Sequence, residues 1–127
     1  MQGKHLFEYA VVRIVPRVER GEFLNVGVVL YCAPQKFLKF LFAIDEERLK
    51  AFYSNCDILE IEEYLKAFEQ ICLGNKEGSK IAQLPIAERF RWLTATRSTI
   101  LQTSKVHPGF CLDAEETLQQ LFIQLVQ

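Results

Sequence analysis

Residues 6–44, LFEYAVVRIVPRVERGEFLNVGVVLYCAPQKFLKFLFAI, decide the fold because they contain three apolar runs separated by two short polar links. The runs cover residues 6–15, 23–32 and 37–44, and their many β-branched and aromatic side chains predict three strands. The first run is apolar on both faces, as in a central strand covered on both sides. Links this short favour an antiparallel meander.

Two details of these strands can be read from single residues. Pro16 ends the first strand, because proline has no N–H to donate to a ladder. Gly27 interrupts the second strand and indicates a bulge or a close approach by another group. The second strand is predicted to have one continuous apolar face, formed by Leu24, Val26, Val28, Leu30 and Cys32.

Helix signals dominate the rest of the chain. Asp45 and Asp57 are suitable N-caps for helices expected at residues 46–53 and 58–73, and Asp113 caps one expected at residues 114–126. Pro85 opens a short helix that ends near Leu93. Residues 98–104 alternate in polarity and predict a fourth strand. Because the first strands and the helices are segregated, we predict a single α+β domain with an antiparallel sheet.

Composition disfavours several classes of function. With 127 residues, half of them hydrophobic, the chain is long enough for one domain with a sizeable core. The net charge of −1 gives no general attraction to nucleic acid, so any basic site must be local. No signal-peptide core and no run of about 20 apolar residues is present, so we expect a cytoplasmic protein that does not enter a membrane.

The cysteines and histidines predict neither a metal site nor a disulfide framework. Cys32, Cys56, Cys72 and Cys111 include no C-x-x-C pair, and no histidine lies at zinc-finger spacing. Cys32 falls in a strand pattern and Cys72 in a helix pattern, so both are expected to be buried thiols. We therefore expect no metal and no cofactor.

Residues 88–109, ERFRWLTATRSTILQTSKVHPG, gather much of the chain's hydrogen-bonding chemistry. Arg89, Arg91 and Arg97 are suited to bind phosphate or carboxylate, and Trp92 is suited to stack on a ligand or partner. Trp92 also has a structural interpretation, as a core or interface residue. The segment adds further polar side chains, at Ser98, Thr99, Gln102, Thr103 and Ser104.

His107 adds an imidazole to this segment, but beside Pro108 and Gly109 we expect it in a turn. No G-x-S-x-G, phosphate-binding loop, G-x-G-x-x-G or H-E-x-x-H motif accompanies it. The sequence therefore leaves open whether the protein is an enzyme.

A second polar cluster lies in residues 13–25, RIVPRVERGEFLN. Arg13 interrupts an otherwise apolar strand, and a buried guanidinium needs partners. It either reaches water or a carboxylate, or it contacts a ligand or partner. Arg17, Glu19, Arg20 and Glu22 alternate in charge, which is typical of a solvated turn. Asn25 follows them in the second predicted strand.

The stretches YAVVRIVPRVERGEFLNVGVVLYC (residues 9–32) and ERFRWLTATRSTILQTSKVHPG (residues 88–109) resemble the bacterial family named domain of unknown function 3037. The resemblance extends from Phe7 to the last helix and brings no known activity. It implies a link to HipA-like kinases, hence a partner or regulatory role. The family often has proline where this chain has Thr96. The residues that match its two motifs are Arg13, Arg17, Glu19, Arg20, Asn25, Glu88, Arg89, Arg91, Trp92, Arg97, Ser98, Gln102 and His107.

Three functions follow from these patterns. The favoured one is a non-catalytic module that binds a protein partner through an Arg/Trp-rich surface. The alternative is a small enzyme or ligand-binding domain for a phosphorylated or nucleic-acid substrate, in which Arg13, Arg89, Arg91 and Arg97 converge on an anion. General nucleic-acid binding is disfavoured by the net charge. A single site would require Arg13 and Arg97 to share one pocket.

Overall fold

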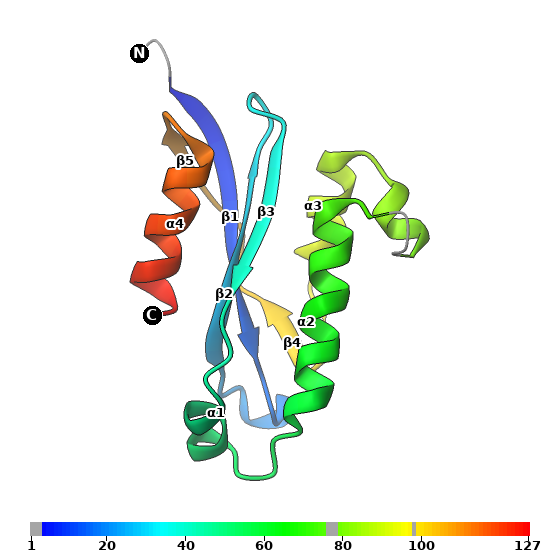
Figure 1. The fold of residues 1–127 in the computed structure, drawn as a ribbon, viewed down its shortest axis with the longest axis vertical. Helices are drawn as coiled ribbons and strands as arrows, with labels where there is room; N and C mark the ends of the chain where they lie inside the picture. The colour runs from blue at the N-terminus through cyan, green and yellow to red at the C-terminus, as the bar shows by residue number, and fades with distance from the viewer. Residues whose placement is uncertain (1–3, 76–78, 98) are drawn as a thin grey trace.

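A computed structural model describes residues 4–75, 79–97 and 99–127 and shows an α+β fold with an antiparallel sheet, as predicted (Figure 1). The strands in the described residues are β1 (His5–Ile14), β2 (Leu24–Cys32), β3 (Phe37–Phe42), β4 (Leu101–Thr103) and β5 (His107–Cys111). The α-helices there are α1 (Glu46–Phe52), α2 (Ile58–Leu73), α3 (Ile86–Leu93) and α4 (Ala114–Leu125). Two 3₁₀ helices are also present, η1 (Val18–Arg20) and η2 (Lys80–Gln83).

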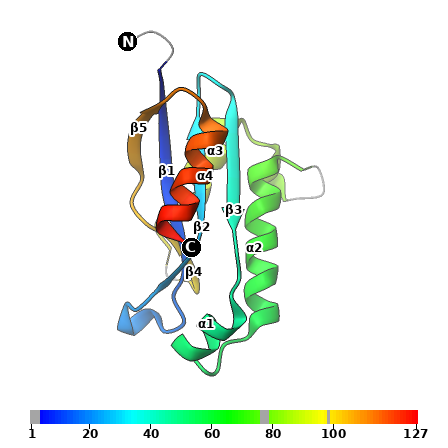
Figure 2. The ribbon, with the colours of Figure 1, turned by 60° about the vertical axis from the view of Figure 1, so that its left-hand side comes forward.

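The molecule has three layers, with the sheet between α4 on one face and α2 and α3 on the other (Figures 1 and 2). The sheet order is β3-β2-β1-β4, and β5 also pairs with β1. The predicted meander of the first three strands is confirmed. None of the described helices combines the length and the apolar character needed to cross a membrane.

β1 is the central strand. It pairs antiparallel with β2 along one edge and with β4 and β5 along the other. Ala10, Val12 and Ile14 are fully buried against the α2 and α3 layer, whereas Phe7 is buried against α4. The prediction that this strand is covered on both faces is therefore confirmed for most of its length.

A bulge in β2 changes which side chains share a face. Val12 lies opposite Gly27, and Arg13 lies opposite Asn25, so Val26 is an extra residue in β2. Val26 consequently packs with Leu24 in the α2 layer, whereas Val28 packs against α4. The prediction of one continuous apolar face from Leu24 to Cys32 is wrong, because the bulge interrupts the alternation that it assumed.

β5 was not expected, and the prediction of a turn at His107 is wrong. His107, Pro108 and Gly109 continue the ladder along β1. Pro108 is tolerated because β5 is an edge strand. A Cβ atom at residue 109 would lie 2.6 Å from the ring of Phe7, so the glycine leaves room for that ring. The strand predicted at residues 98–104 is shorter than expected, because β4 covers only Leu101–Thr103.

Ser104 joins β4 to β5 across a second bulge. Two residues of β1, Ala10 and Val11, lie opposite three residues here, 104–106. The Ser104 hydroxyl accepts a hydrogen bond from the Val11 N–H at 2.9 Å, and the Ser104 N–H donates to the Val11 carbonyl at 2.8 Å. The serine therefore completes the ladder where the backbone alone leaves it incomplete.

The predicted helix starts are confirmed by their caps. The side chains of Asp45, Asp57 and Asp113 accept hydrogen bonds from backbone N–H groups in the first turns of α1, α2 and α4. α2 and α3 occur where the sequence predicts them. All four cysteines are free, and Cys32 and Cys72 are buried, as expected.

We predict that Gly27→Ala lowers the free energy of unfolding by about 2 kcal/mol. The new methyl group would lie 2.5 Å from Cε1 of Phe40 and 2.7 Å from the carbonyl oxygen of Leu41, and backbone cannot move aside as a side chain can. Urea unfolding followed by circular dichroism measures the change.

Gly21→Asn is the matched control. Gly21 has φ 69°, which asparagine tolerates, and nothing lies within 4 Å of a Cβ built there. Gly21→Asn should lower the free energy of unfolding by no more than about 1 kcal/mol. Equal stability of Gly27→Ala and the unsubstituted protein would contradict the close packing of β2 against β3.

Candidate functional site

Trp92 and Arg97 form a stacked pair at the end of α3. The guanidinium carbon of Arg97 lies 4.0 Å from the centroid of the Trp92 ring, within the range of a cation–π contact. Arg97 also donates a hydrogen bond to the Trp92 carbonyl. Partial burial lowers the pKa of Arg97, although a guanidinium of this kind stays charged at neutral pH. Trp92 remains 39% exposed, so the pair is presented to solvent.

This pair lines a shallow apolar pocket of about 200 Å³. Its lining includes Phe68 and Ile71 from α2, Leu101 from β4 and the partly exposed Tyr64. We call Trp92, Arg97 and these four residues the Trp92–Arg97 surface. Arg97 is its one charged lining residue among those the structure describes.

The two other arginines of α3 are bound elsewhere. Arg89 donates from Nη1 to the carbonyls of Ile71, at 3.3 Å, and Cys72, at 3.2 Å, and so satisfies the last turn of α2. Arg91 binds Glu8 of β1 through two hydrogen bonds of 2.5 and 2.8 Å. These contacts give both residues structural roles, because they join α3 to α2 and to the sheet.

Arg13 lies on the α4 side of the sheet. Its guanidinium carbon is 3.8 Å from the centroid of the Phe23 ring, and burial lowers its pKa. Its Nε atom is buried without a hydrogen-bond partner. In the sheet, Arg13 lies opposite Asn25 of β2 and opposite Gln102 of β4. Asn25 donates to the Leu125 carbonyl at 3.2 Å and so ties β2 to the end of α4.

The structure does not bring the predicted anion-binding arginines together. Arg13 stacks on Phe23 on the α4 side, whereas Arg97 lines a pocket with residues of α2 on the opposite side of the sheet. No pocket that we describe is lined by both. Gln102 lines a small hollow with Arg97 and donates to the Thr99 carbonyl at 2.8 Å. Ser98 lies outside the described residues.

Four hydroxyl groups in the described part of residues 94–104 bind the backbone of an irregular segment. In the described part of this segment, the hydroxyls of Thr94, Thr99, Thr103 and Ser104 all donate to backbone carbonyls. His107 instead packs against the Tyr9 ring, with centroids 5.3 Å apart. The hydrogen bonds that the structure describes thus include no serine or threonine paired with a histidine.

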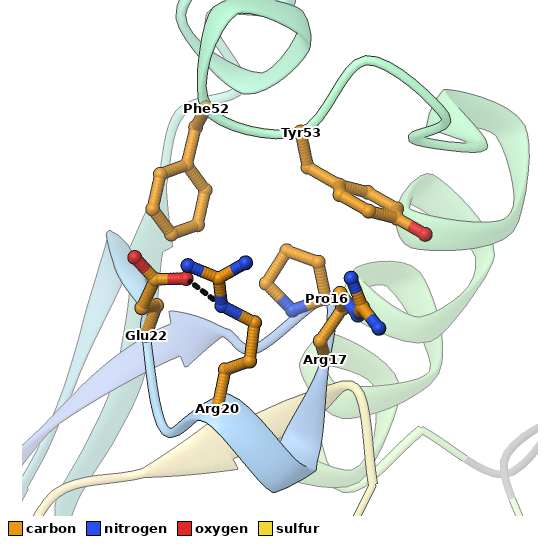
Figure 3. A pocket seen from close by; sticks show the side chains of 6 residues that line it. All are labelled: Pro16, Arg17, Arg20, Glu22, Phe52 and Tyr53. Carbon is orange, nitrogen blue, oxygen red and sulfur yellow. Dashed lines mark ion pairs between the residues drawn. The ribbon is translucent and has the colours of Figure 1, made fainter.

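A second pocket, which we call the η1 pocket, lies between η1 and the end of α1 (Figure 3). Its volume is about 200 Å³. Its lining residues are Pro16, Arg17, Arg20, Glu22, Phe52 and Tyr53. The mixed charges around Arg17 were expected to form a solvated turn, and their side chains are indeed exposed. No sequence pattern indicates Phe52 and Tyr53, because they join the residues of this turn only in the folded chain.

No three His, Cys, Asp or Glu side chains gather into a metal-binding group within residues 4–75, 79–97 and 99–127. The buried thiol of Cys72 has its pKa raised to about 12, chiefly by burial, so it is not a reactive thiolate at neutral pH.

The sequence matches the model of the family described as "Protein of unknown function (DUF3037)" over residues 9–126. No curated protein and no solved structure matches the chain. The match includes both sequence motifs, and the description assigns no activity.

We predict that the Glu8–Arg91 pair makes the stability of the protein depend on acidic pH. The hydrogen bond from Arg91 lowers the pKa of Glu8 below its ordinary value of 4.5, against the opposing effect of burial. The stabilisation is therefore present above about pH 4.5 and is lost as the pH falls through the lower pKa of the folded state. Since Arg91 is more than half exposed, it amounts to no more than about 1 kcal/mol.

A double-mutant cycle of Glu8→Gln and Arg91→Gln, measured by urea unfolding at neutral pH and well below pH 4, isolates this pair. The coupling energy should be present at neutral pH and fall towards zero in acid. A coupling that is absent at neutral pH, or independent of pH, would contradict the assignment.

Proposed function

The chain belongs to the DUF3037 family of proteins of unknown function, and we propose that it is a non-catalytic module that binds a protein partner through the Trp92–Arg97 surface. The observation that carries this proposal is the exposed Trp92 ring, stacked by Arg97 at the rim of an apolar pocket. Tryptophan, tyrosine and arginine are the residue types most enriched among energetic hot spots of protein interfaces.

The surface is also ordered before any partner arrives. Arg97 is held by the ring below it and by its hydrogen bond to the Trp92 carbonyl, and Trp92 extends from a regular helix. Side chains that are already fixed lose less conformational entropy on binding. A partner therefore gains more from this pair than from arginines that move freely in solvent.

The chemistry of the surface defines what the partner must present. An apolar side chain would fill the pocket above Phe68 and Leu101, and a neighbouring carboxylate would pair with the Arg97 guanidinium. A HipA-like kinase is our candidate partner on the basis of the family resemblance. We place this interaction in the bacterial cytoplasm, which the four free cysteines support.

An enzyme or ligand-binding domain with converging arginines has less support. Arg13, Arg89, Arg91 and Arg97 contact Phe23, the end of α2, Glu8 and Trp92 respectively, so each guanidinium already has a separate neighbour. No single anion reaches Arg13 and Arg97 from opposite sides of the sheet.

We predict that Trp92→Ala and Arg97→Glu each weaken partner binding at least about tenfold, because the first removes the ring and the second reverses the charge beside the pocket. Affinity capture from the native host with the unsubstituted protein identifies the stoichiometric partner. Titration calorimetry with that purified partner then measures each variant.

Phe110→Ala is the matched control, since Phe110 is a 70% exposed aromatic residue on β5, away from this surface. It should bind as the unsubstituted protein does. Recovery of no stoichiometric partner, or a partner whose affinity is unaffected by Trp92→Ala and Arg97→Glu, would refute the proposal.

A further inference from the structure

We propose that the η1 pocket is a second binding site, whose ligand is a small aromatic anion made of one planar ring bearing a phosphate or carboxylate group. This site shares no lining residue with the Trp92–Arg97 surface. It combines two guanidinium groups and two aromatic rings, which are the groups that recognise the two parts of such a ligand.

The turn itself places the two arginines on one side. Arg17 immediately precedes η1 and Arg20 ends it, and the Arg20 N–H donates to the Arg17 carbonyl at 3.0 Å, so the two arginines lie close together across one turn. Gly21 then ends the turn in the left-handed conformation, with φ 69°. In Figure 3, both guanidinium groups rise from this turn towards the rings of Phe52 and Tyr53.

Two carboxylates orient these guanidinium groups without using all of their donors. Nε of Arg17 lies 3.1 Å from Glu19, and Nε of Arg20 lies 2.7 Å from Glu22. None of the hydrogen bonds that the structure describes uses a terminal nitrogen of either arginine. These nitrogens therefore remain as donors for an anion, and planar guanidinium forks match phosphate and carboxylate oxygens.

Phe52 and Tyr53 supply the aromatic wall. They are consecutive, but α1 ends at Phe52 and Tyr53 is extended, with φ −150°, so both rings face the pocket (Figure 3). Phe52 is 37% exposed and Pro16 lies between the two arginines in the view, which leaves an apolar surface for a ring to cover. A planar ring stacked there would be buried by aromatic and guanidinium groups together.

Charge and size restrict the ligand further. Glu19 and Glu22 offset the charges of the two arginines, so attraction of an anion depends on directed hydrogen bonds and on the ring. An isolated phosphate should therefore bind weakly. A volume of about 200 Å³ lies below the usual range for drug-sized ligands and suits one ring with one anionic group.

Nuclear magnetic resonance titration of the ¹⁵N-labelled chain tests the proposal, with phenyl phosphate, benzoate and inorganic phosphate added separately at constant ionic strength. We expect phenyl phosphate or benzoate to shift the backbone amide signals of residues 17–22 and 52–53, and to bind at least about tenfold more tightly than inorganic phosphate. Comparison of the two aromatic probes shows which anionic group is preferred.

Substitutions separate the two halves of the site. The double variant Arg17→Gln/Arg20→Gln should bind the preferred aromatic probe at least tenfold more weakly (about one unit in log Kd). Arg91→Gln is the control, because it removes a carboxylate-paired arginine outside the pocket, and it should leave the affinity for the probe unchanged. Phe52→Ala should reduce its affinity to that of inorganic phosphate. The unperturbed signals of α4 verify that each variant is folded.

Three outcomes would overturn the proposal: no shift of those amides at about 10 mM of either aromatic probe, equal affinity for inorganic phosphate, or unchanged binding by the double arginine variant. None of these measurements depends on whether a protein partner binds the Trp92–Arg97 surface. The η1 pocket and that surface are therefore tested separately, and one proposal can be refuted while the other stands.

Discussion

The fold depends on hydrogen bonding along both edges of β1. This ten-residue strand pairs with β2 on one side and with β4 and β5 on the other, and the Ser104 hydroxyl completes the second edge at Val11. Its side chains are also buried in both layers, so β1 connects the core under α2 and α3 to the core under α4. A change in the register of β1 would move both cores at once.

Each of the two proposed binding surfaces includes a segment next to β1. The η1 turn leaves the end of β1 after Pro16, and the connection from α3 returns to β1 through β4. The Val15 N–H donates to the Ile100 carbonyl at 2.7 Å, which joins these two segments directly. Both sequence motifs therefore meet at one end of the central strand, although their arginines project to different neighbours.

Local patterns predicted most elements, because the strands, the caps and the helical faces depend on residues close in sequence. Asp57 and the apolar spacing after it are sufficient to place α2. Pairing with β1 could not be predicted in the same way. Residues 107–109 look like a turn, yet the edge of β1 extends them into β5, and one extra residue at Val26 reverses the faces around it.

For the candidate sites too, local sequence patterns indicated single residues but not the contacts between distant segments. The exposed Trp92 and the stacked Arg97 lie in the stretch that the sequence singled out. The cap that Arg89 forms on α2 and the pocket that Phe52 and Arg20 share both join distant segments, and no local spacing indicates them. Sequence patterns thus indicated candidate residues for a site but not which of them share a pocket.

The most direct test of the central claim uses the fact that Trp92 is the only tryptophan in the sequence. When the chain is labelled with 5-fluorotryptophan, its ¹⁹F spectrum reports on this one ring. Addition of the unlabelled partner should shift and broaden that signal in proportion to the fraction bound. A signal that stays unchanged while the complex forms would show that the partner binds elsewhere, and would contradict the account.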